Sequence, residues 1–273
     1  MRPDRAELPT GVIRMDLGTS GRRAIVCGST RGLGRACAEA LAAEGVHLVL
    51  NGLDQGRTQA AADEIAKAFE VEVAAVAADV GTAQGRAALI AACPEADILV
   101  NNTGGPPVLP LDEMTEAQFV AALNAVMMSA VLLTKAVIPG MVARRFGRIV
   151  NVTSGQVTAP RSEMALSAGP RAGLTAVMKG LSIDVVPYNV TINNLLPERF
   201  ATDRQRNHAR AAAAELNIPL EEALLERGKS VAARRLGDPQ EFGATCAFVC
   251  SAHAGFMTGQ NIHLDGGSYP GLV

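Results

Sequence analysis

The chain has 273 residues, with 27 acidic and 25 basic side chains and a formal net charge of −2. This near balance of charge disfavours nucleic acid or an anionic membrane surface as the main partner. Hydrophobic residues make up 48% of the chain and aromatic residues only 3%. A core of Ala, Val, Leu and Ile suits helices packed on a parallel sheet, and the length allows one α/β domain.

The cysteine pattern contains no Cys-x-x-Cys pair. Cys246 and Cys250 lie four residues apart, which would place them on one face of a helix. Because no further His or Cys accompanies them, we expect small buried thiols and no metal site. Unpaired thiols also favour a cytoplasmic location.

The N-terminal residues 1–20 predict a loose leader, and they contain no apolar signal segment. The most apolar long stretch, residues 121–143, is interrupted by Asn124, Lys135 and Pro139. We interpret it as a core helix, and we expect no membrane partner.

Short β-branched runs alternate with Ala-rich helical stretches along most of the chain. In chain order the pattern predicts strand 24–27, helix 33–44, strand 46–50, helix 55–69, strand 71–76, helix 82–92, strand 97–100, helix 115–138, strand 147–153, helix 167–186, strand 189–193, helix 239–251 and strand 261–264. This alternation predicts an α/β fold, with a single Rossmann-type doubly wound parallel sheet and helices on both faces. We expect residues 21–273 to form one dinucleotide-binding domain.

Residues 200–235 interrupt the alternation and predict a lid-like insertion of one or two surface helices. Its basic residues are Arg204, Arg206, Arg210, Arg227, Lys229, Arg234 and Arg235. They suggest an anionic substrate, such as a carboxylate or a phosphate. Acidic residues interleave with them, so a solvated helix face is the alternative interpretation.

A glycine loop follows the first predicted strand directly. Glycines at this point allow a tight turn and a close approach of the backbone to a pyrophosphate, which the N-terminus of the next helix attracts. The candidate cofactor-binding residues of this loop are Gly28, Ser29, Arg31, Gly32, Leu33 and Gly34.

With its Gly-x-x-x-Gly-x-Gly spacing, the chain resembles the short-chain dehydrogenase/reductase family, in particular its 3-oxoacyl-carrier-protein reductases. Further resemblance lies in Ala78-Asp79-Val80, Asn101-Asn102-Thr103-Gly104, the strand Gly147 to Ser154, and the segments 235–241 and 258–267. The resemblance implies additional cofactor contacts at Asp79, Val80, Asn101, Gly104, Arg171, Pro197 and Thr202.

The end of the second predicted strand bears on the choice of cofactor. NAD-preferring members of the family usually carry an acid there to bind the ribose hydroxyls, whereas this chain has Gly52. Arg31 can pair with the 2′-phosphate of NADP. However, Leu53 occupies a position where many NADP-using members have Arg, and Asp54 follows it. We favour NADP and keep NAD as the alternative.

The family's catalytic tyrosine and lysine are absent. The resemblance assigns the active-site serine to Ser154 and an active-site asparagine to Asn124. It aligns Ser167 with the tyrosine and Arg171, one helical turn later, with the lysine. Serine is far less acidic than a phenol, whose pKa is about 10, and arginine stays charged without moving protons. Arg171 can still hold the nicotinamide ribose or a developing alkoxide.

Other groups could replace the missing proton donor. Glu198 follows the sixth strand, where the family has glycine, and is either a proton source or a solvent-facing loop residue. Glu163 is a weaker candidate for the same role. The four histidines, His47, His208, His253 and His263, lie outside the recognised motifs, and we interpret them as structural or surface residues.

The resemblance implies a cytoplasmic NAD(P)-dependent oxidoreductase that interconverts a carbonyl and an alcohol on a small molecule. It also implies a homo-oligomer, dimer or tetramer, assembled through helices 115–138 and 167–186. The altered active site leaves a nucleotide-binding pseudoenzyme, acting as a cofactor sensor or partner subunit, as the alternative. A lyase or isomerase that uses the same pocket is a third possibility.

Overall fold

The computed structural model describes residues 15–272. Seven parallel strands form one sheet in the order β3-β2-β1-β4-β5-β6-β7. The strands are β1 (Arg23–Val26), β2 (His47–Gly52), β3 (Val73–Ala77), β4 (Ile98–Asn101), β5 (Gly147–Val152), β6 (Val190–Pro197) and β7 (Asn261–Leu264). The predicted doubly wound parallel sheet is confirmed. The strand order reverses between β1 and β4, and ligands bind at such a reversal, beyond the carboxyl ends of the strands.

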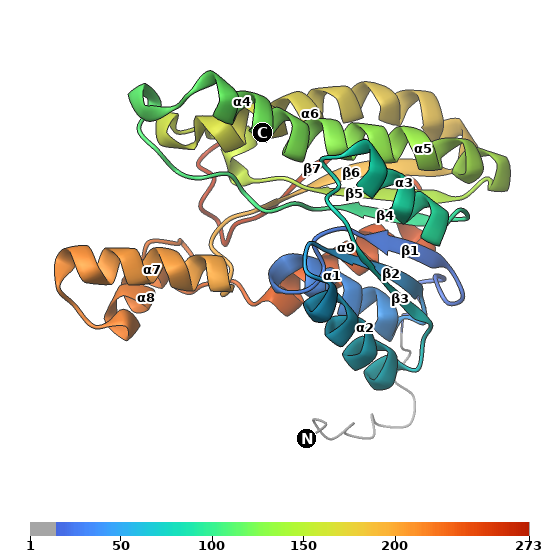
Figure 1. Cartoon of the computed structure of the whole chain (residues 1–273), viewed down its shortest axis with the longest axis horizontal. Coiled ribbons are helices and arrows are strands. Elements are labelled where there is room, and N and C mark those ends of the chain that lie inside the picture. The colour runs from blue at the N-terminus through green and yellow to red at the C-terminus, as the bar shows by residue number, and fades with distance from the viewer. Residues whose placement is uncertain (1–14, 273) are drawn as a thin grey trace.

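Helices cover both faces of the sheet (Figure 1). They are α1 (Gly32–Ala43), α2 (Gln55–Phe69), α3 (Ala83–Ala92), α4 (Glu116–Ala122), α5 (Ser129–Arg144), α6 (Ala165–Val185), α7 (Asp203–Leu216), α8 (Leu220–Lys229) and α9 (Pro239–Val249). In Figure 1, α1, α2 and α9 lie below the sheet, and α3 to α6 lie above it. A π-helical turn over Leu123–Met128 connects α4 and α5.

The core has one apolar layer on each side of the sheet. Leu41, Ile65 and Phe242 belong to the layer under α1, α2 and α9, and Leu133 and Met141 belong to the opposite layer. The small side chains of α1 and α9 let these two helices approach closely. A Cβ atom at Gly243 of α9 would lie 2.3 Å from the backbone oxygen of Ala36, so this glycine is needed for the contact.

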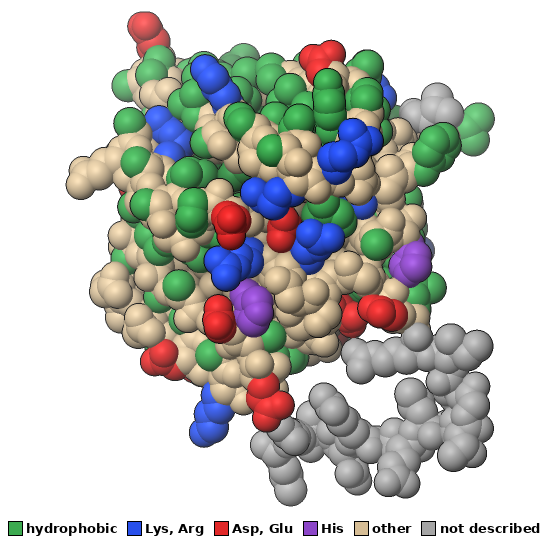
Figure 2. Space-filling model, turned by 90° about the vertical axis from the view of Figure 1, so that its right-hand side faces the viewer, with side chains coloured by type: hydrophobic (Ala, Val, Ile, Leu, Met, Phe, Trp, Pro, Cys, Tyr) green, Lys and Arg blue, Asp and Glu red, His purple; other side chains and the backbone are tan. Residues whose placement is uncertain are grey.

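The continuous helix Glu116–Arg144 is long and apolar enough to cross a membrane by length and composition. One such helix is weak evidence, because core helices of soluble proteins have the same features. Its inner side contributes Ala130, Leu133 and Val137 to the apolar layer on the sheet. Figure 2 shows hydrophobic side chains gathered at the top of the molecule, where α5 and α6 lie, above a face where acidic and basic side chains are interspersed.

The two segments predicted to lie outside the sheet differ in their packing. Residues 1–14 of the predicted leader lie outside the described residues. Leu17 packs on the core and Thr19 is buried, so the end of the leader is not loose. In the predicted insertion, α7 and α8 form a helical pair with a small apolar cluster of its own, which includes Ala209 and Ala223. The pair extends beyond the carboxyl ends of the strands (Figure 1). We call residues 203–229 the lid segment.

Candidate active site

The glycine loop after β1 makes the tight turn that its sequence predicts. Gly28 and Gly32 have φ angles of +55° and +59°, which favour glycine. A Cβ atom at Gly34 would lie 2.2 Å from the backbone oxygen of Gly28. Asn102 holds the loop from β4, because its Nδ2 donates to the backbone oxygen of Gly28 over 3.1 Å. The loop is therefore held in one conformation, and a side chain at Gly34 would not fit.

The N-terminus of α1 has no side-chain cap. The N-cap residue, Arg31, forms no capping hydrogen bond, whereas Asp54, Thr82 and Asp238 cap α2, α3 and α9. The first amides of an α-helix need acceptors, and an uncapped N-terminus provides N–H donors for a phosphate. The loop and the first turn of α1 thus fit the pyrophosphate of a dinucleotide. The side chain of Ser29 is buried and adds no donor, because its Oγ donates to the backbone oxygen of Asn51 over 3.3 Å and accepts from the Asn51 amide over 3.0 Å. Leu33 packs against the core.

The end of β2 has no room for an acidic side chain. A Cβ atom at Gly52 would lie 2.5 Å from Thr58 Oγ1 and 2.6 Å from Thr30 Cγ2. Asp54 is exposed and accepts a hydrogen bond from the Arg57 amide, which lowers the pKa of its carboxyl group. Asp54 therefore acts as the cap of α2. Nothing acidic at position 52 opposes a 2′-phosphate.

Arg31 is the basic residue of the glycine loop. Its side chain is exposed, and its Nη1 lies 3.8 Å from Asp203 Oδ2 of the lid segment. This ion pair connects the glycine loop with the start of α7. An exposed pair of this kind is weak, so Arg31 remains available to a phosphate.

The next cofactor candidates follow β3 and β4. Asp79 is exposed, and its Oδ1 accepts a hydrogen bond from the Gly81 amide over 2.8 Å, which leaves Oδ2 for a ligand. Val80 is buried and lines a cavity beside Arg171. No atom lies within 4 Å of a Cβ built at Gly104, so the space beside this glycine is open.

Asn101 has a structural role that its motif did not reveal. Its Nδ2 donates to Asn151 Oδ1 over 2.9 Å, Asn151 Nδ2 donates to Asn194 Oδ1, and Asn194 Nδ2 donates to Asn261 Oδ1. These four side chains form a ladder across β4, β5, β6 and β7. Asn101 also lines the cavity beside Arg171, so a ligand can contact it there.

Ser154 and Arg171 both lie at the end of β5, where Arg171 contacts Val152, the last residue of the strand. Ser154 follows β5, and its Oγ accepts a hydrogen bond from the Gln156 amide over 3.2 Å. On α6, Arg171 Nε donates to Ser167 Oγ over 3.1 Å, and Arg171 Nη1 donates to the backbone oxygen of Val152 over 2.7 Å. Since Ser167 Oγ accepts from Arg171, the hydroxyl proton of Ser167 is free to be donated elsewhere.

Arg171 is a buried charge at this site, with 7% of its surface exposed. Burial and, to a smaller extent, the neighbouring Arg204 lower the pKa of Arg171 to about 10. The guanidinium group therefore stays charged at neutral pH. Its Nη2 has no hydrogen-bond partner among the described residues, and the side chain lines a small cavity with Cys27, Asn102 and Val126.

The structure does not bring Asn124 to this site. Asn124 is exposed on the outer side of the long helix, whereas Val126 is buried and lines the cavity beside Arg171. The π-helical turn over Leu123–Met128 changes the rotation per residue at this point, so a position judged from sequence spacing can face the wrong way. This geometry argues against the predicted catalytic role of Asn124.

The residues after β6 lie across from the glycine loop. Thr202 precedes α7, and a Cβ atom at Gly32 would lie 3.7 Å from its Cγ2. Pro197 ends β6 beside Leu264 of β7. Glu198 is near Ser154, because its Oε2 lies 3.4 Å from a Cβ built at Gly155, and its Oε1 lies 3.6 Å from Arg199 Nε.

Glu163, His47 and His253 lie outside the candidate active site. Glu163 is half-buried and pairs with Arg161, 3.5 Å away, and it does not line either cavity. His47 accepts a hydrogen bond from the Glu72 amide before β3, and His253 contacts the backbone of Asp16, so both lie away from the strand carboxyl ends.

The structure brings His263 to this region, although sequence reasoning interpreted it as a structural or surface residue. This residue lines a second cavity of about 370 Å³ together with Glu198 and Asp265. His263 Nε2 lies 3.3 Å from Thr158 Oγ1, and its ring stacks on Tyr269. His263 lies in β7, between Gln260 and Asp265 of segment 258–267, and the pairing of β7 with β6 brings it here.

All five cysteines are free and buried, as expected. Burial raises the pKa of Cys27, in the cavity wall, to about 12, so this thiol is not a nucleophile at neutral pH. Within residues 15–272, no cluster of His, Cys, Asp and Glu could hold a metal ion.

Comparison with known proteins agrees with this geometry. A family model described as enoyl-(acyl carrier protein) reductase matches residues 28–269. The 3-oxoacyl-[acyl-carrier-protein] reductase FabG of Vibrio cholerae is 31% identical over 255 residues, covering 91% of this chain and 98% of that protein. The NADPH-dependent reductase BacG of Bacillus subtilis is 29% identical over 254 residues, with the same shares of 91% and 98%.

Among solved structures, the L-sorbose reductase of Gluconobacter frateurii, complexed with NADPH and L-sorbose, matches with a TM-score of 0.91 and 29% identity. The match covers 94% of this chain and 100% of that one. These relatives carry the names of working reductases, which gives the pseudoenzyme alternative no support.

Proposed function

Because the chain belongs to the short-chain dehydrogenase/reductase family, we propose that it is an NADP-dependent oxidoreductase that interconverts a carbonyl and an alcohol on a small molecule. The observation that carries this proposal is the pair formed by Ser167 and the buried Arg171 beside Ser154. The pair lies on the sheet edge where the glycine loop and α1 offer uncapped amides to a dinucleotide.

NADP(H) is the cofactor in this proposal. Gly28, Gly32 and Gly34 let the backbone approach the pyrophosphate, and the first amides of α1 bind it. Arg31 binds the 2′-phosphate, and Gly52 leaves this region free of acidic groups. The names of BacG and of the sorbose reductase complex include NADPH, which supports the same choice.

The other cofactor contacts follow from the positions of the remaining candidates. Asp79 and Val80 border the adenine, and Asn101 and Gly104 border the adjoining ribose. Pro197 and Thr202 enclose the nicotinamide from the side of β6, and Arg171 binds the nicotinamide ribose through its free Nη2.

Each reactive group at the end of β5 has a separate task in the reaction. Bound NADPH supplies the hydride that the carbonyl carbon accepts. Ser154 orients the carbonyl oxygen, and Ser167 donates its free hydroxyl proton to that oxygen and regains a proton from water. Arg171 stabilises the negative charge that develops on the oxygen, which is an oxyanion-hole effect. Proton donation by serine is slower than by a phenol, so we expect a modest turnover number.

Assembly and location complete the proposal. Exposed apolar side chains lie on the outer sides of the long helix and of α6; they are Val120, Leu123, Met128, Val177 and Ile183. Burying them in a contact with a second copy of the chain would remove apolar surface from water, so we propose a homo-oligomer. The five free cysteines are compatible with a cytoplasmic location.

The experiment compares Ser167→Ala with Ser182→Ala, a matched control on the same helix whose serine is also buried but bonds only to the backbone of Lys179. A panel of ketones and aldehydes is screened for NADPH oxidation by the wild-type protein, and the variants are tested on the best substrate. We expect Ser167→Ala to lower kcat by about 100-fold while the Kd for NADPH changes little. Equal kcat values for Ser167→Ala and the wild type would contradict the role of Ser167.

A further inference from the structure

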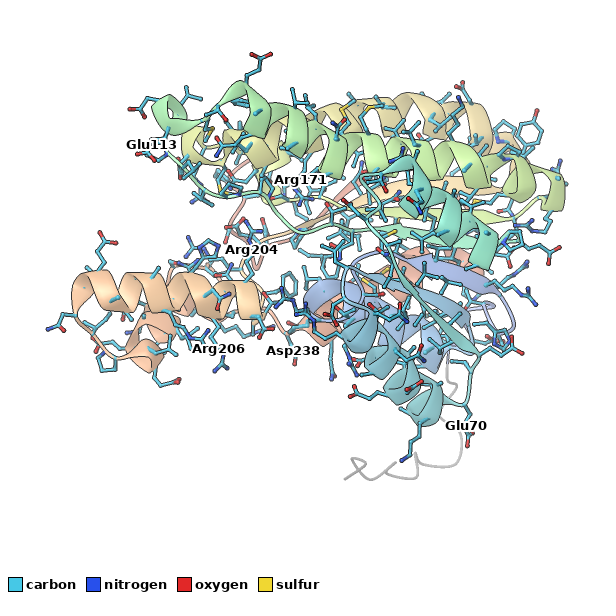
Figure 3. All side chains as sticks on the ribbon, in the orientation of Figure 1. Glu70, Glu113, Arg171, Arg204, Arg206 and Asp238 are labelled. Atoms are coloured by element: carbon cyan, nitrogen blue, oxygen red, sulfur yellow. The ribbon has the colours of Figure 1, made fainter. Side chains whose placement is uncertain are left out.

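Two arginines approach each other between α6 and the lid segment. Figure 3 shows Arg171 on the sheet side and Arg204 on the side of α7 that faces it, while Arg206 points away from this gap. Arg204 Nη2 lies 3.4 Å from the backbone oxygen of Pro106, and its Nη1 lies 1.9 Å from a Cβ built at Gly105. The guanidinium of Arg204 therefore rests on the loop after β4, at the edge of the proposed substrate site.

Neither arginine has a carboxylate partner within the part of the chain that the structure describes. Arg171 donates only to Ser167 and Val152, and Arg204 only to Pro106. The nearby acids are engaged elsewhere. Asp203 pairs with Arg31 over 3.8 Å, and Glu198 pairs with Arg199 over 3.6 Å. Two guanidinium groups thus face each other without a compensating negative charge.

Further basic groups of the lid segment strengthen the positive potential. Burial, Arg204 and Arg227 lower the pKa of His208, and burial followed by Arg199 lowers the pKa of Arg227. Arg227 donates to Gln205 Oε1 over 2.7 Å, and Glu198 is the acid near enough to oppose the lowering of its pKa. The acids of α8, Glu221, Glu222 and Glu226, are all exposed. Arg204 is exposed, so an anion can reach its guanidinium, and the excess of basic groups around it attracts one.

We propose that Arg204 binds a carboxylate group of the substrate. This inference rests on the proposed function, because it assigns the substrate class of the same site. Planar guanidinium groups suit a carboxylate, which they bind through paired hydrogen bonds. The cofactor phosphates have their own partners at α1 and Arg31, whereas Arg204 contacts the loop after β4. The substrate is therefore an oxo acid or a hydroxy acid.

The test measures binding by titration calorimetry in the presence of NADP⁺, which allows no turnover of a ketone. The probes are acetoacetate, 4-oxopentanoate and 2-oxoglutarate, each with its methyl ester, and inorganic phosphate as a separate arm. The proteins are the wild type, Arg204→Gln and Arg206→Gln, which removes the same charge from the other side of α7. We expect the wild type and Arg206→Gln to bind at least one acid about ten-fold more tightly than its ester, and Arg204→Gln to lose this preference.

Gly105→Ala provides a second variant, because its added methyl group would displace the Arg204 guanidinium without removing the charge. We expect it to weaken acid binding as well. Equal binding of acid and ester by the wild type for all three probes would overturn the proposal, as would a preference that survives in Arg204→Gln. Tighter binding of phosphate than of any acid would assign the site to a phosphorylated substrate instead.

Separate readouts distinguish this inference from the proposed function. If Arg204→Gln weakened NADP⁺ binding as much as acid binding, Arg204 would belong to the cofactor site and the inference would fail. If the wild type bound no NADP⁺, the proposed function would fail. The same acid and ester titrations without cofactor would then still test whether Arg204 binds a carboxylate.

Discussion

Arg148 and Arg171 are both buried arginines, and their hydrogen bonds differ. Arg148 donates to the backbone oxygens of Ser251, Gly147 and Asn189, and its guanidinium lies 4.4 Å from the centre of the Phe146 ring. Arg171 has two acceptors and one free nitrogen atom. Arg148 is therefore satisfied by the fold, whereas Arg171 carries an incompletely satisfied charge, which is typical of a binding residue.

Replacing Arg171 by methionine tests this difference. Because the folded pKa of Arg171 is lowered to about 10, the buried charged form opposes folding at neutral pH. The unfolded chain binds this proton more tightly, so the contribution of Arg171 to stability rises as the pH increases above about 10. We expect Arg171→Met to leave the free energy of unfolding unchanged or to raise it by up to about 2 kcal/mol at pH 7. NADPH binding should weaken at the same time.

Urea denaturation and a cofactor titration on the same samples provide the two readouts. The control is Arg148→Met, which removes a fully bonded guanidinium and should lower stability clearly. A large loss of stability in Arg171→Met would show that Arg171 has a structural role like that of Arg148.

Local spacing predicted some of these residues, and others depended on tertiary structure. Ser167 and Arg171 lie one helical turn apart, so their contact follows from helix geometry alone. Asn124 was placed in the site by its position in a long helix, but the π-helical turn over Leu123–Met128 directs Val126 to the cavity instead. Arg204 is one of several basic residues in the lid segment. Only the fold shows that Arg204 faces Arg171 whereas Arg206 points away from it (Figure 3).

At the scale of elements, the sequence predicted strands and helices to within a few residues. The helix 55–69 and the strand 261–264 agree with α2 and β7, and α2 begins directly after Asp54, whose side chain caps it. The largest difference is the helix predicted to end at 138, which continues to Arg144 through Pro139. A proline inside a helix predicts an end there, but packing of α5 on the sheet prevails over this local preference.

The asparagine ladder is an element-scale feature that the strand patterns could not predict. Its members Asn151 and Asn194 are buried in the middle of the sheet, and each bonds to an asparagine on the neighbouring strand. The register of β5 and β6 aligns these two residues directly. Residues from four separate strands thus combine into one network only after the strands have paired.

Replacing Asn151 by leucine should therefore destabilise the sheet. The change removes two buried hydrogen bonds and leaves amide groups of Asn101 and Asn194 without these partners, at about 1–3 kcal/mol for each. We expect the free energy of unfolding to fall by about 2–4 kcal/mol, measured by urea denaturation. Asn207→Leu, on the exposed surface of α7, is the control and should change it by less than about 0.5 kcal/mol. A similarly small effect of Asn151→Leu would contradict a stabilising role for the ladder.

At the scale of the whole molecule, the sheet places the glycine loop, the end of β5 and the lid segment around one edge (Figure 1). The Arg31–Asp203 pair joins two of these parts. The sequence predicted that the site lies at this edge, because the carboxyl ends of all parallel strands lie there. The sequence could not predict which faces of α7 and α8 meet the sheet, since the lid segment has its own small apolar cluster and few contacts that fix its orientation.

The central claim is that this edge binds a nicotinamide cofactor although Ser167 and Arg171 replace tyrosine and lysine. The most direct measurement is a titration of the purified protein with NADPH and with NADH, followed by cofactor fluorescence. We expect saturable binding of NADPH, about ten-fold tighter than that of NADH, because Arg31 bonds to the 2′-phosphate and no acid at position 52 opposes it. Absence of binding of either cofactor, in a sample shown to be folded by circular dichroism, would contradict the account.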